Sequence, residues 1–370
     1  MKNPKERIIT AIILLSMLFV IYSVAVSSAS LPKPSAKAAV LYEPTTKSFL
    51  YTKNADMKLP MASTTKIMTA LVAIENFPLD SSIIVADEAI GIEGSSLYLT
   101  KSETLTMMDL VTALMLRSAN DAAVAIAYAV SGGVDAFAEL MNKRCESLGL
   151  ENTNFKNPHG LDHKEHYTTA KELALIAAEA MNNEVFKSIV SKKSATIESD
   201  IATRVVSNHN KLLSLYDGAN GIKTGYTKRC GRCLVGSCER DELSFITVTL
   251  DAPNDWDDHI ALFEYGYSRL QYLKGADVGE FIYKIPIINS NNQYITVSNN
   301  DAFGIIAERN STELKHYVKL PHFVAAPIKE GDIIGKVVFL LDDEYAGEID
   351  LVAQSEINTE NKRKLFSFIK

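Results

Sequence analysis

The segment PMASTTKIMTA, residues 60–70, places Ser63 three residues before Lys66 at the start of an apolar, helix-favouring stretch. Residues three apart lie on one face of a helix, so the serine hydroxyl and the lysine ammonium can meet. Serine is a weak nucleophile until a base takes its proton. A lysine can be that base when burial or a second cation lowers its pKa. Taken alone, the pattern also fits a solvated helix with Ser63 or a neighbour as its cap.

Two further short motifs follow along the chain. The segment SAN, residues 118–120, brings a hydroxyl and a carboxamide together, a pair that can relay a proton and hold a substrate amide. The segment KTG, residues 223–225, reads as a strand whose lysine and threonine can bind a carboxylate through charge-assisted hydrogen bonds. Each also has a structural explanation, since Ser118 could cap a helix and KTG could be an ordinary strand and turn.

The three motifs in this order match the set found in penicillin-binding proteins and class A β-lactamases, which have aspartate where this chain has Ala119. Neighbouring segments extend the match, and the chain resembles the D-alanyl-D-alanine carboxypeptidase family of low-molecular-mass penicillin-binding proteins from about residue 38 to residue 273. The segments that carry it besides the motifs are FKNPHGLD, residues 155–162, HYTTA, residues 166–170, and NHNKLL, residues 208–213.

The resemblance implies an acyl-transfer site that needs no metal or cofactor. Its substrates would be peptidoglycan stem peptides, with β-lactams as covalent inhibitors of the same serine. The implied roles are Ser63 as nucleophile, Lys66 as general base, Ser118 as proton relay, Asn120 as holder of the substrate amide and of Lys66, and Lys223 as electrostatic and proton-relay group; Lys223, Thr224, Gly225, Tyr226 and Thr227 would bind substrate.

The chain departs from the family pattern at two places. Cys230 stands where the family commonly has alanine. Many members carry an arginine in the region of residues 257–259 that helps to bind the terminal carboxylate of the substrate, whereas this chain has Asp-Asp-His there. The residue that holds the carboxylate is therefore open between Lys223, Thr224 and a different basic residue.

The order of helix-like and strand-like segments predicts a mixed α/β fold. Strand patterns lie on both sides of a helix-rich middle, which indicates a sheet assembled from distant chain segments. The resemblance implies a catalytic domain of the β-lactamase and transpeptidase type, with an antiparallel sheet and helices, over residues 30–274. Short strand-like runs between turn residues then predict a small all-β sandwich over residues 275–356.

The two ends of the chain predict export and a membrane contact. Lys2, Lys5 and Arg7 precede a long apolar run, and small residues follow, so residues 1–29 read as a signal peptide, with a retained anchor as the alternative. The tail, residues 357–370, is short, basic and amphipathic at its end, which fits contact with a membrane surface or a frayed terminus. With a net charge of -7, the chain lacks the excess of positive charge that is typical of nucleic-acid-binding proteins.

The four cysteines do not require metal or redox chemistry. Cys230 and Cys233 form a C-x-x-C, but a structural zinc site needs four ligands, and no histidine pairs with these cysteines in sequence. Small buried thiols on a core strand are the simpler interpretation.

Two other functions share the motif set. A serine β-lactamase would need an additional base for deacylation, and no matching glutamate can be identified. A non-catalytic, penicillin-sensing or wall-binding protein would be expected to have lost a motif, and all three are intact.

Overall fold

The computed structural model describes residues 30–311 and 313–359. The predicted signal peptide and most of the predicted basic tail lie outside these residues. Among the described residues, no single helix has the length and apolar character needed to span a membrane, although α4 (Asn120–Ser131) and α5 (Val134–Ser147) pass that test together as a pair bent by 82°.

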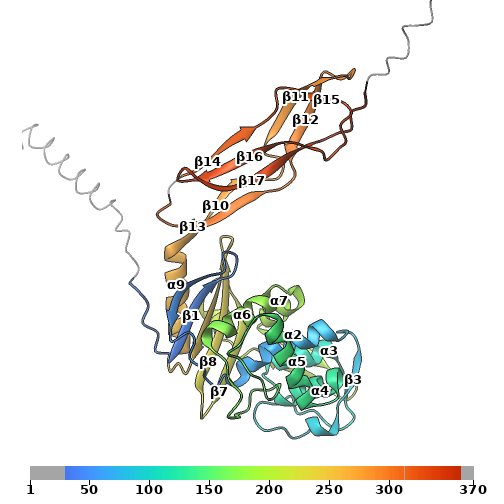
Figure 1. Cartoon of the computed structure of the whole chain (residues 1–370). Coiled ribbons are helices and arrows are strands. Elements are labelled where there is room, and N and C mark those ends of the chain that lie inside the picture. Colours follow the sequence, from blue (N-terminus) through green and yellow to red (C-terminus); the bar gives the residue numbers. More distant parts are fainter. Residues whose placement is uncertain (1–29, 312, 360–370) are drawn as a thin grey trace, which may run out of the picture.

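A five-stranded antiparallel sheet forms the centre of the larger part of the molecule (Figure 1). Its first two strands come from the beginning of the chain and its other three from beyond residue 218, so the helix-rich middle is inserted between them. In spatial order the strands are β2 (Ser48–Lys53), β1 (Ala38–Glu43), β9 (Leu243–Leu250), β8 (Gly231–Arg240) and β7 (Ala219–Thr227). The prediction of a mixed α/β fold with a sheet built from distant segments is confirmed.

Helices cover both faces of this sheet. The inserted segment packs a large apolar cluster against one face, whereas a single long helix, α9 (Asp255–Arg269), covers the other (Figure 1). The inserted helices are α2 (Lys66–Asn76), α3 (Met107–Leu116), α4 (Asn120–Ser131), α5 (Val134–Ser147), α6 (Ala170–Met181), α7 (Glu184–Val190) and α8 (Leu212–Leu215). The inserted segment also contains two short helices, η1 (Ala62–Thr65) and η2 (Asp87–Ala89). Two pairs of strands complete this segment: β3 (Ser82–Ile84) with β4 (Thr104–Thr106), and β5 (Ser194–Glu198) with β6 (Thr203–Ser207).

Two local expectations about capping differ from the structure. Ser63 lies inside the 3-10 turn η1, and the cap position of the helix that carries Lys66 falls on its neighbour Thr65, whose side chain makes no capping hydrogen bond. Ser118 does not cap α4 either: the cap position is Ala119, and no side chain caps that end. Ser118 instead has a positive φ of 63°, a conformation that is costly for a residue with a Cβ and that is found mostly at functional sites.

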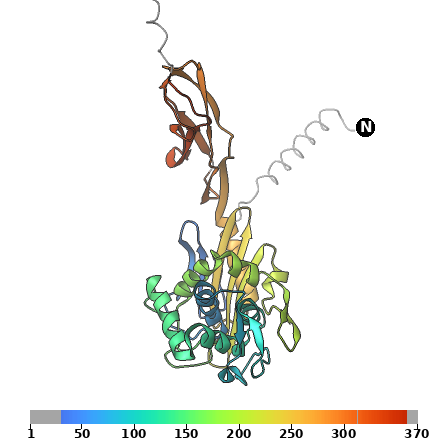
Figure 2. The same ribbon diagram turned by 90° about the vertical axis from the view of Figure 1, so that its right-hand side faces the viewer.

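The β-rich end stands apart from the helices, beyond the end of α9 (Figure 2). Its core is a separate cluster of buried apolar side chains. The strands are β10 (Leu270–Ala276) paired with β13 (Phe303–Glu308), and a six-stranded sheet of β14 (Leu314–Lys319), β16 (Ile333–Leu341), β17 (Glu344–Ala353), β12 (Tyr294–Asn299), β11 (Ile282–Ile288) and β15 (Val324–Ala325). The predicted all-β character of this end is confirmed.

Candidate active site

The fold brings the three sequence motifs to the edge of the central sheet. The short helix η1 carries Ser63, the turn before α4 carries Ser118, and the edge strand β7 carries KTG. Ser63, Ser118 and Thr224 line one cavity of about 400 Å³. Residues about 160 positions apart in sequence therefore face a single space.

Lys66 is fully buried beneath the nucleophile. Its Nζ atom lies 3.0 Å from Oγ of Ser63, 2.7 Å from Oδ1 of Asn120 and 2.5 Å from the carbonyl oxygen of His159. Burial, and then the positive charge of Lys223, hold the pKa of Lys66 well below its ordinary value, against a smaller opposing effect of Asp121. Both effects shift the equilibrium of this lysine toward the neutral amine.

The hydrogen-bonding capacities of its partners determine how the side-chain amine of Lys66 is oriented. A neutral lysine has two N–H donors and one lone pair. The carbonyl oxygen of His159 can only accept, and the side-chain amide of Asn120 is oriented by its own Nδ2, which donates to the carbonyl of Glu93 at 2.6 Å. Both oxygens therefore take an N–H from Lys66, and when the amine is neutral its lone pair is left for the hydroxyl of Ser63. This is the arrangement of a general base and its nucleophile.

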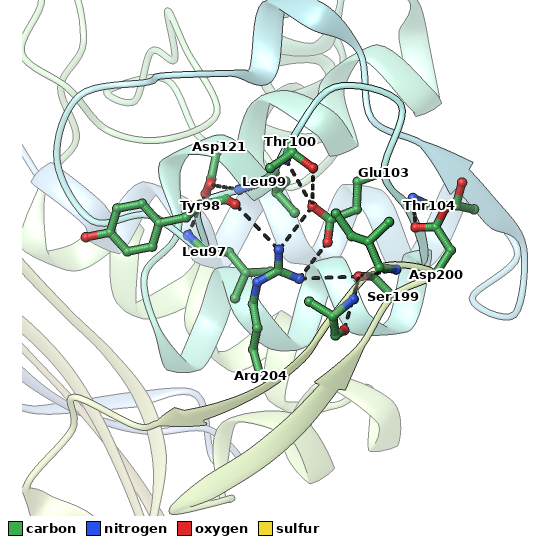
Figure 3. A network of polar contacts seen from close by, with 12 residues as sticks. Leu97, Tyr98, Leu99, Thr100, Glu103, Thr104, Asp121, Ser199, Asp200 and Arg204 are labelled. Atoms are coloured by element: carbon green, nitrogen blue, oxygen red, sulfur yellow. Dashed lines mark hydrogen bonds and ion pairs between the residues drawn. The ribbon is translucent and has the colours of Figure 1, made fainter.

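A loop over residues 93–100 fixes Asn120 from the other side. The backbone N–H of Asn120 donates to the carbonyl of Ser95 at 2.7 Å. Asp121 holds the same loop through N–H groups of Leu97 and Leu99 at 3.0 and 3.1 Å (Figure 3). Because Ser95 also lines the cavity, this loop is part of the wall of the site.

A buried ion pair supports the end of that loop. The carboxylate of Glu103, whose side chain is 0% exposed, accepts from Nη1 of Arg204 at 2.5 Å and from the N–H of Thr100 at 3.0 Å (Figure 3). Arg204 lies on β6, so the pair joins the β5–β6 hairpin to the loop beside Asn120. Burial raises the pKa of Glu103, but hydrogen bonds from Arg204, Ser199 and Thr100 outweigh it, and the net pKa is lowered.

The strand β7 closes the site on the opposite side. Lys223 is buried, its Nζ donates to the carbonyl of Thr224 at 3.1 Å, and burial lowers its pKa to about 7. Gly225 follows, and a Cβ at this position would lie 3.1 Å from the backbone nitrogen of Ser63. A glycine is therefore needed for the close approach of this strand to the nucleophile.

The cavity has a second wall that the motifs did not reveal. Besides Thr224, Gly225 and Tyr226, its lining includes His209, Lys211, Arg232, Asp255 and Trp256. The segment at residues 208–213 had been noted for its family resemblance, but no local signal marks Arg232, Asp255 or Trp256. Thr227, predicted to bind substrate, is placed differently: its hydroxyl donates to Asp162 at 2.9 Å, and it is not among the lining residues.

The four cysteines do not line this cavity. All four are buried and free. Only Cys233 and Cys238 lie on a strand, since Cys230 is in the turn before β8 and Cys145 is on α5, so the expectation of core-strand thiols holds for two of the four. Within residues 30–311 and 313–359, no three His, Cys, Asp or Glu side chains are arranged to hold a metal ion.

A serine hydroxyl facing a buried neutral lysine, under a loop and a sheet edge, defines a serine acyl-transfer enzyme. Comparison with known families gives the same class. Residues 25–254 match the family model described as D-alanyl-D-alanine carboxypeptidase, and residues 271–359 match that of the C-terminal domain of penicillin-binding protein 5. The chain belongs to the D-alanyl-D-alanine carboxypeptidase family.

Individual relatives agree over nearly the whole chain. The D-alanyl-D-alanine carboxypeptidase DacF of Bacillus subtilis is 28% identical over 350 residues, which are 90% of this chain and 88% of that protein. The crystal structure of DacD from Francisella tularensis superposes with a TM-score of 0.64 at 28% identity, covering 90% of this chain and 96% of that one. Penicillin-binding protein 5 of Haemophilus influenzae has a TM-score of 0.64 at 27% identity, covering 88% and 98%.

Proposed function

We propose that this protein removes the terminal D-alanine from peptidoglycan stem pentapeptides through an acyl-enzyme on Ser63. The observation that carries the proposal is the 3.0 Å contact between Nζ of the buried Lys66 and Oγ of Ser63, together with the lowered pKa of that lysine. Lys66 takes the proton of Ser63 as its oxygen attacks the carbonyl carbon between the two D-alanines. The new C–O bond and the C–N bond that breaks give an acyl-enzyme and free D-alanine.

The other motif residues complete the transfer. Ser118 and Lys223 relay the proton to the departing amine, and Asn120 holds the substrate amide as well as Lys66. The backbone N–H groups of Ser63 and Tyr226 face the oxyanion, and donors of this kind are worth about 3–4 kcal/mol each. Water then releases the acyl group. Thr227 is assigned to the turn with Asp162 and not to substrate contact.

The cavity lining argues against the β-lactamase alternative. In the described part of the chain the one carboxylate that lines this cavity is Asp255, and it is paired with Arg232 at 2.7 Å. Rapid hydrolysis of a drug acyl-enzyme needs an additional base beside the serine, as in class A enzymes. We therefore expect β-lactams to trap the protein in a long-lived adduct.

The test is release of D-alanine from a synthetic stem pentapeptide by the purified protein and by its Ser63→Ala variant. We expect release by the first and none by the second. Covalent binding of penicillin without D-alanine release from any stem peptide would favour the non-catalytic, penicillin-sensing alternative. Fast, repeated nitrocefin hydrolysis would favour the β-lactamase alternative.

We also propose that the protein acts outside the cytoplasm and contacts the membrane surface through its C-terminal tail. The basic and then apolar composition of residues 1–29, together with a substrate class that lies in the cell wall, supports export. Lys362, Arg363 and Lys364 precede a mostly apolar run that ends at Lys370. Co-sedimentation with anionic vesicles tests the tail: binding should be lost when residues 357–370 are removed, and binding that persists would refute it.

A further inference from the structure

Arg232 lies beside the substrate-binding strand on the face opposite the helical core. In the β7–β8 register it is directly across from Tyr226. Side chains alternate along a strand, so Arg232 shares a face with Tyr226 and is the diagonal neighbour of Thr224. All three residues line the cavity that contains Ser63.

The guanidinium of Arg232 is held in place by the first turn of α9. Its Nε and Nη2 atoms donate to Oδ1 of Asp255 at 3.0 and 2.7 Å. The side chain of Asp255 is 4% exposed, and its Oδ1 also accepts from the N–H of Trp256 at 3.0 Å. The guanidinium carbon lies 5.7 Å from the centre of the Trp256 ring. A side chain fixed on two sides in this way loses little freedom when it binds a ligand.

One part of the guanidinium is left for a ligand. The Arg232 side chain is 43% exposed, and its Nη1 atom donates no hydrogen bond to any residue in ranges 30–311 and 313–359. The planar N–H groups of arginine suit carboxylate oxygens. A carboxylate placed between Nη1 of Arg232 and the hydroxyl of Thr224 would meet both donors from one wall of the cavity.

Asp258 and His259 make their contacts away from the cavity. The carboxylate of Asp258 accepts from the backbone N–H and the hydroxyl of Ser35, both at 2.8 Å. His259 is fully buried between the hydroxyls of Thr247 and Thr249, at 2.6 and 2.9 Å. Neither residue lines the cavity. The start of α9 therefore contributes no cation to the site, and contributes instead the aspartate that orients Arg232.

We propose that Arg232, supplied by β8, is the specificity-determining residue that selects substrates with a free terminal carboxylate, and that Asp255 is its positioning residue. This inference rests on the proposed carboxypeptidase function and names the group that recognises the end of its substrate. Lys211 is the matched alternative, because it is another cation that lines the same cavity.

The experiment compares two peptides that differ only at the recognised group. One is an acylated tripeptide ending in D-Ala-D-Ala, and the other ends in D-alaninamide, which has no carboxylate. kcat/KM is measured for both with the full-length protein and with Arg232→Ala, Arg232→Gln and Lys211→Ala. Loss of one charged hydrogen bond predicts a fall of about 10- to 100-fold for the acid with either Arg232 variant. In the two Arg232 variants, kcat/KM for the amide peptide should change by less than about threefold. In Lys211→Ala, kcat/KM for each of the two peptides should also change by less than about threefold.

Asp255→Asn tests the positioning role. The amide of asparagine can keep one hydrogen bond to Arg232 but loses the charge, so KM for the acid should rise while kcat for the amide peptide stays unchanged. Rescue of acid selectivity by Arg232→Lys should be partial, because an ammonium lacks the planar fork of donors.

Three outcomes would overturn the inference. Equal losses on both peptides in Arg232→Ala and Arg232→Gln would show a merely structural role. A selective loss in Lys211→Ala with none in the Arg232 variants would assign the carboxylate to Lys211. Wild-type protein that releases D-alanine normally, with Arg232 variants that do the same, would refute the inference while leaving the proposed function intact. If wild-type protein released nothing from either peptide, the proposed function would fail, and the inference with it.

Discussion

The Nζ atom of Lys66 lies 3.0 Å from the Oγ atom of Ser63, at the junction between a 3-10 turn and an α-helix. The turn holds the serine at the cavity surface while the lysine, the first residue of α2, is buried. This difference in burial separates the two roles. The hydroxyl is accessible to a substrate, and burial lowers the pKa of the amine.

Replacing the base should remove most of the acylation rate. Lys66→Ala leaves Ser63 without a proton acceptor, and general-base catalysis is worth about 10²- to 10⁴-fold in rate. The measurement is the rate constant for acylation by a fluorescent penicillin in stopped flow. Lys171→Ala, on the partly exposed face of α6, is the control and should acylate at the normal rate. An acylation rate in Lys66→Ala within threefold of wild type would rule out Lys66 as the base.

The dependence of kcat/KM on pH should be bell-shaped, with its rise set by Lys66 and its fall set by Lys223. Lys66 must be neutral to act, and its lowered pKa means that kcat/KM rises as pH increases through that pKa. Lys223 is assigned a positive charge, and burial lowers its pKa to about 7, so kcat/KM falls as pH rises past about 7.

His209 provides the control for this profile. It lines the same cavity, and burial, followed by the charges of Lys223 and Arg117, lowers its pKa. We expect His209→Gln to keep both limbs. Disappearance of a limb in this variant would assign that limb to the histidine.

Breaking the Glu103–Arg204 pair should destabilise the protein. Glu103→Gln leaves the partly buried Arg204 without its charged partner (Figure 3), at a cost of about 1–3 kcal/mol. Thermal unfolding at pH 7 measures this. Because the pKa of Glu103 is lowered in the folded state, its contribution is present above the ordinary value of 4.5 and is lost as pH falls through the lowered pKa. The stabilities of wild type and variant should therefore converge in acid, and a difference that persists at pH 2 would contradict this explanation.

Gly160 should be irreplaceable beside the nucleophile. It has a φ of +85°, and a Cβ there would lie 1.9 Å from the carbonyl oxygen of Ala62, next to Ser63. Gly149 has a similar φ of +71° with nothing within 4 Å of the added atom. Gly149→Ala should cost about 1 kcal/mol of stability from backbone strain alone and keep activity. Gly160→Ala should lose acylation as well, and equal behaviour of the two variants would refute the contact.

The sequence predicted most of the helical layer because its signals are local. The start of the helix Met107–Leu116 is capped by Thr106, whose side chain accepts from the N–H of Asp109. The helix Ala170–Met181 likewise begins directly after its capping residue, Thr169. Caps and apolar spacing are contained within a few neighbouring residues.

The parts that could not be predicted depend on distant contacts. Nothing in the segment around Arg232 shows that Asp255 will hold its guanidinium, because the pairing depends on how α9 packs against β8. The helix Asp255–Arg269 was itself not predicted. The loop that orients Asn120 was missed for the same reason, since its supports, Glu103 and Arg204, are 101 positions apart.

The most direct test of the acyl-enzyme is intact-protein mass spectrometry after incubation with benzylpenicillin, followed by peptide mapping. We predict an increase by the mass of one drug molecule, located on Ser63, that persists for many minutes and is missing in Ser63→Ala. An unchanged mass, or an adduct that remains in Ser63→Ala, would mean that the three motifs do not form one acylating site, and it would contradict the account.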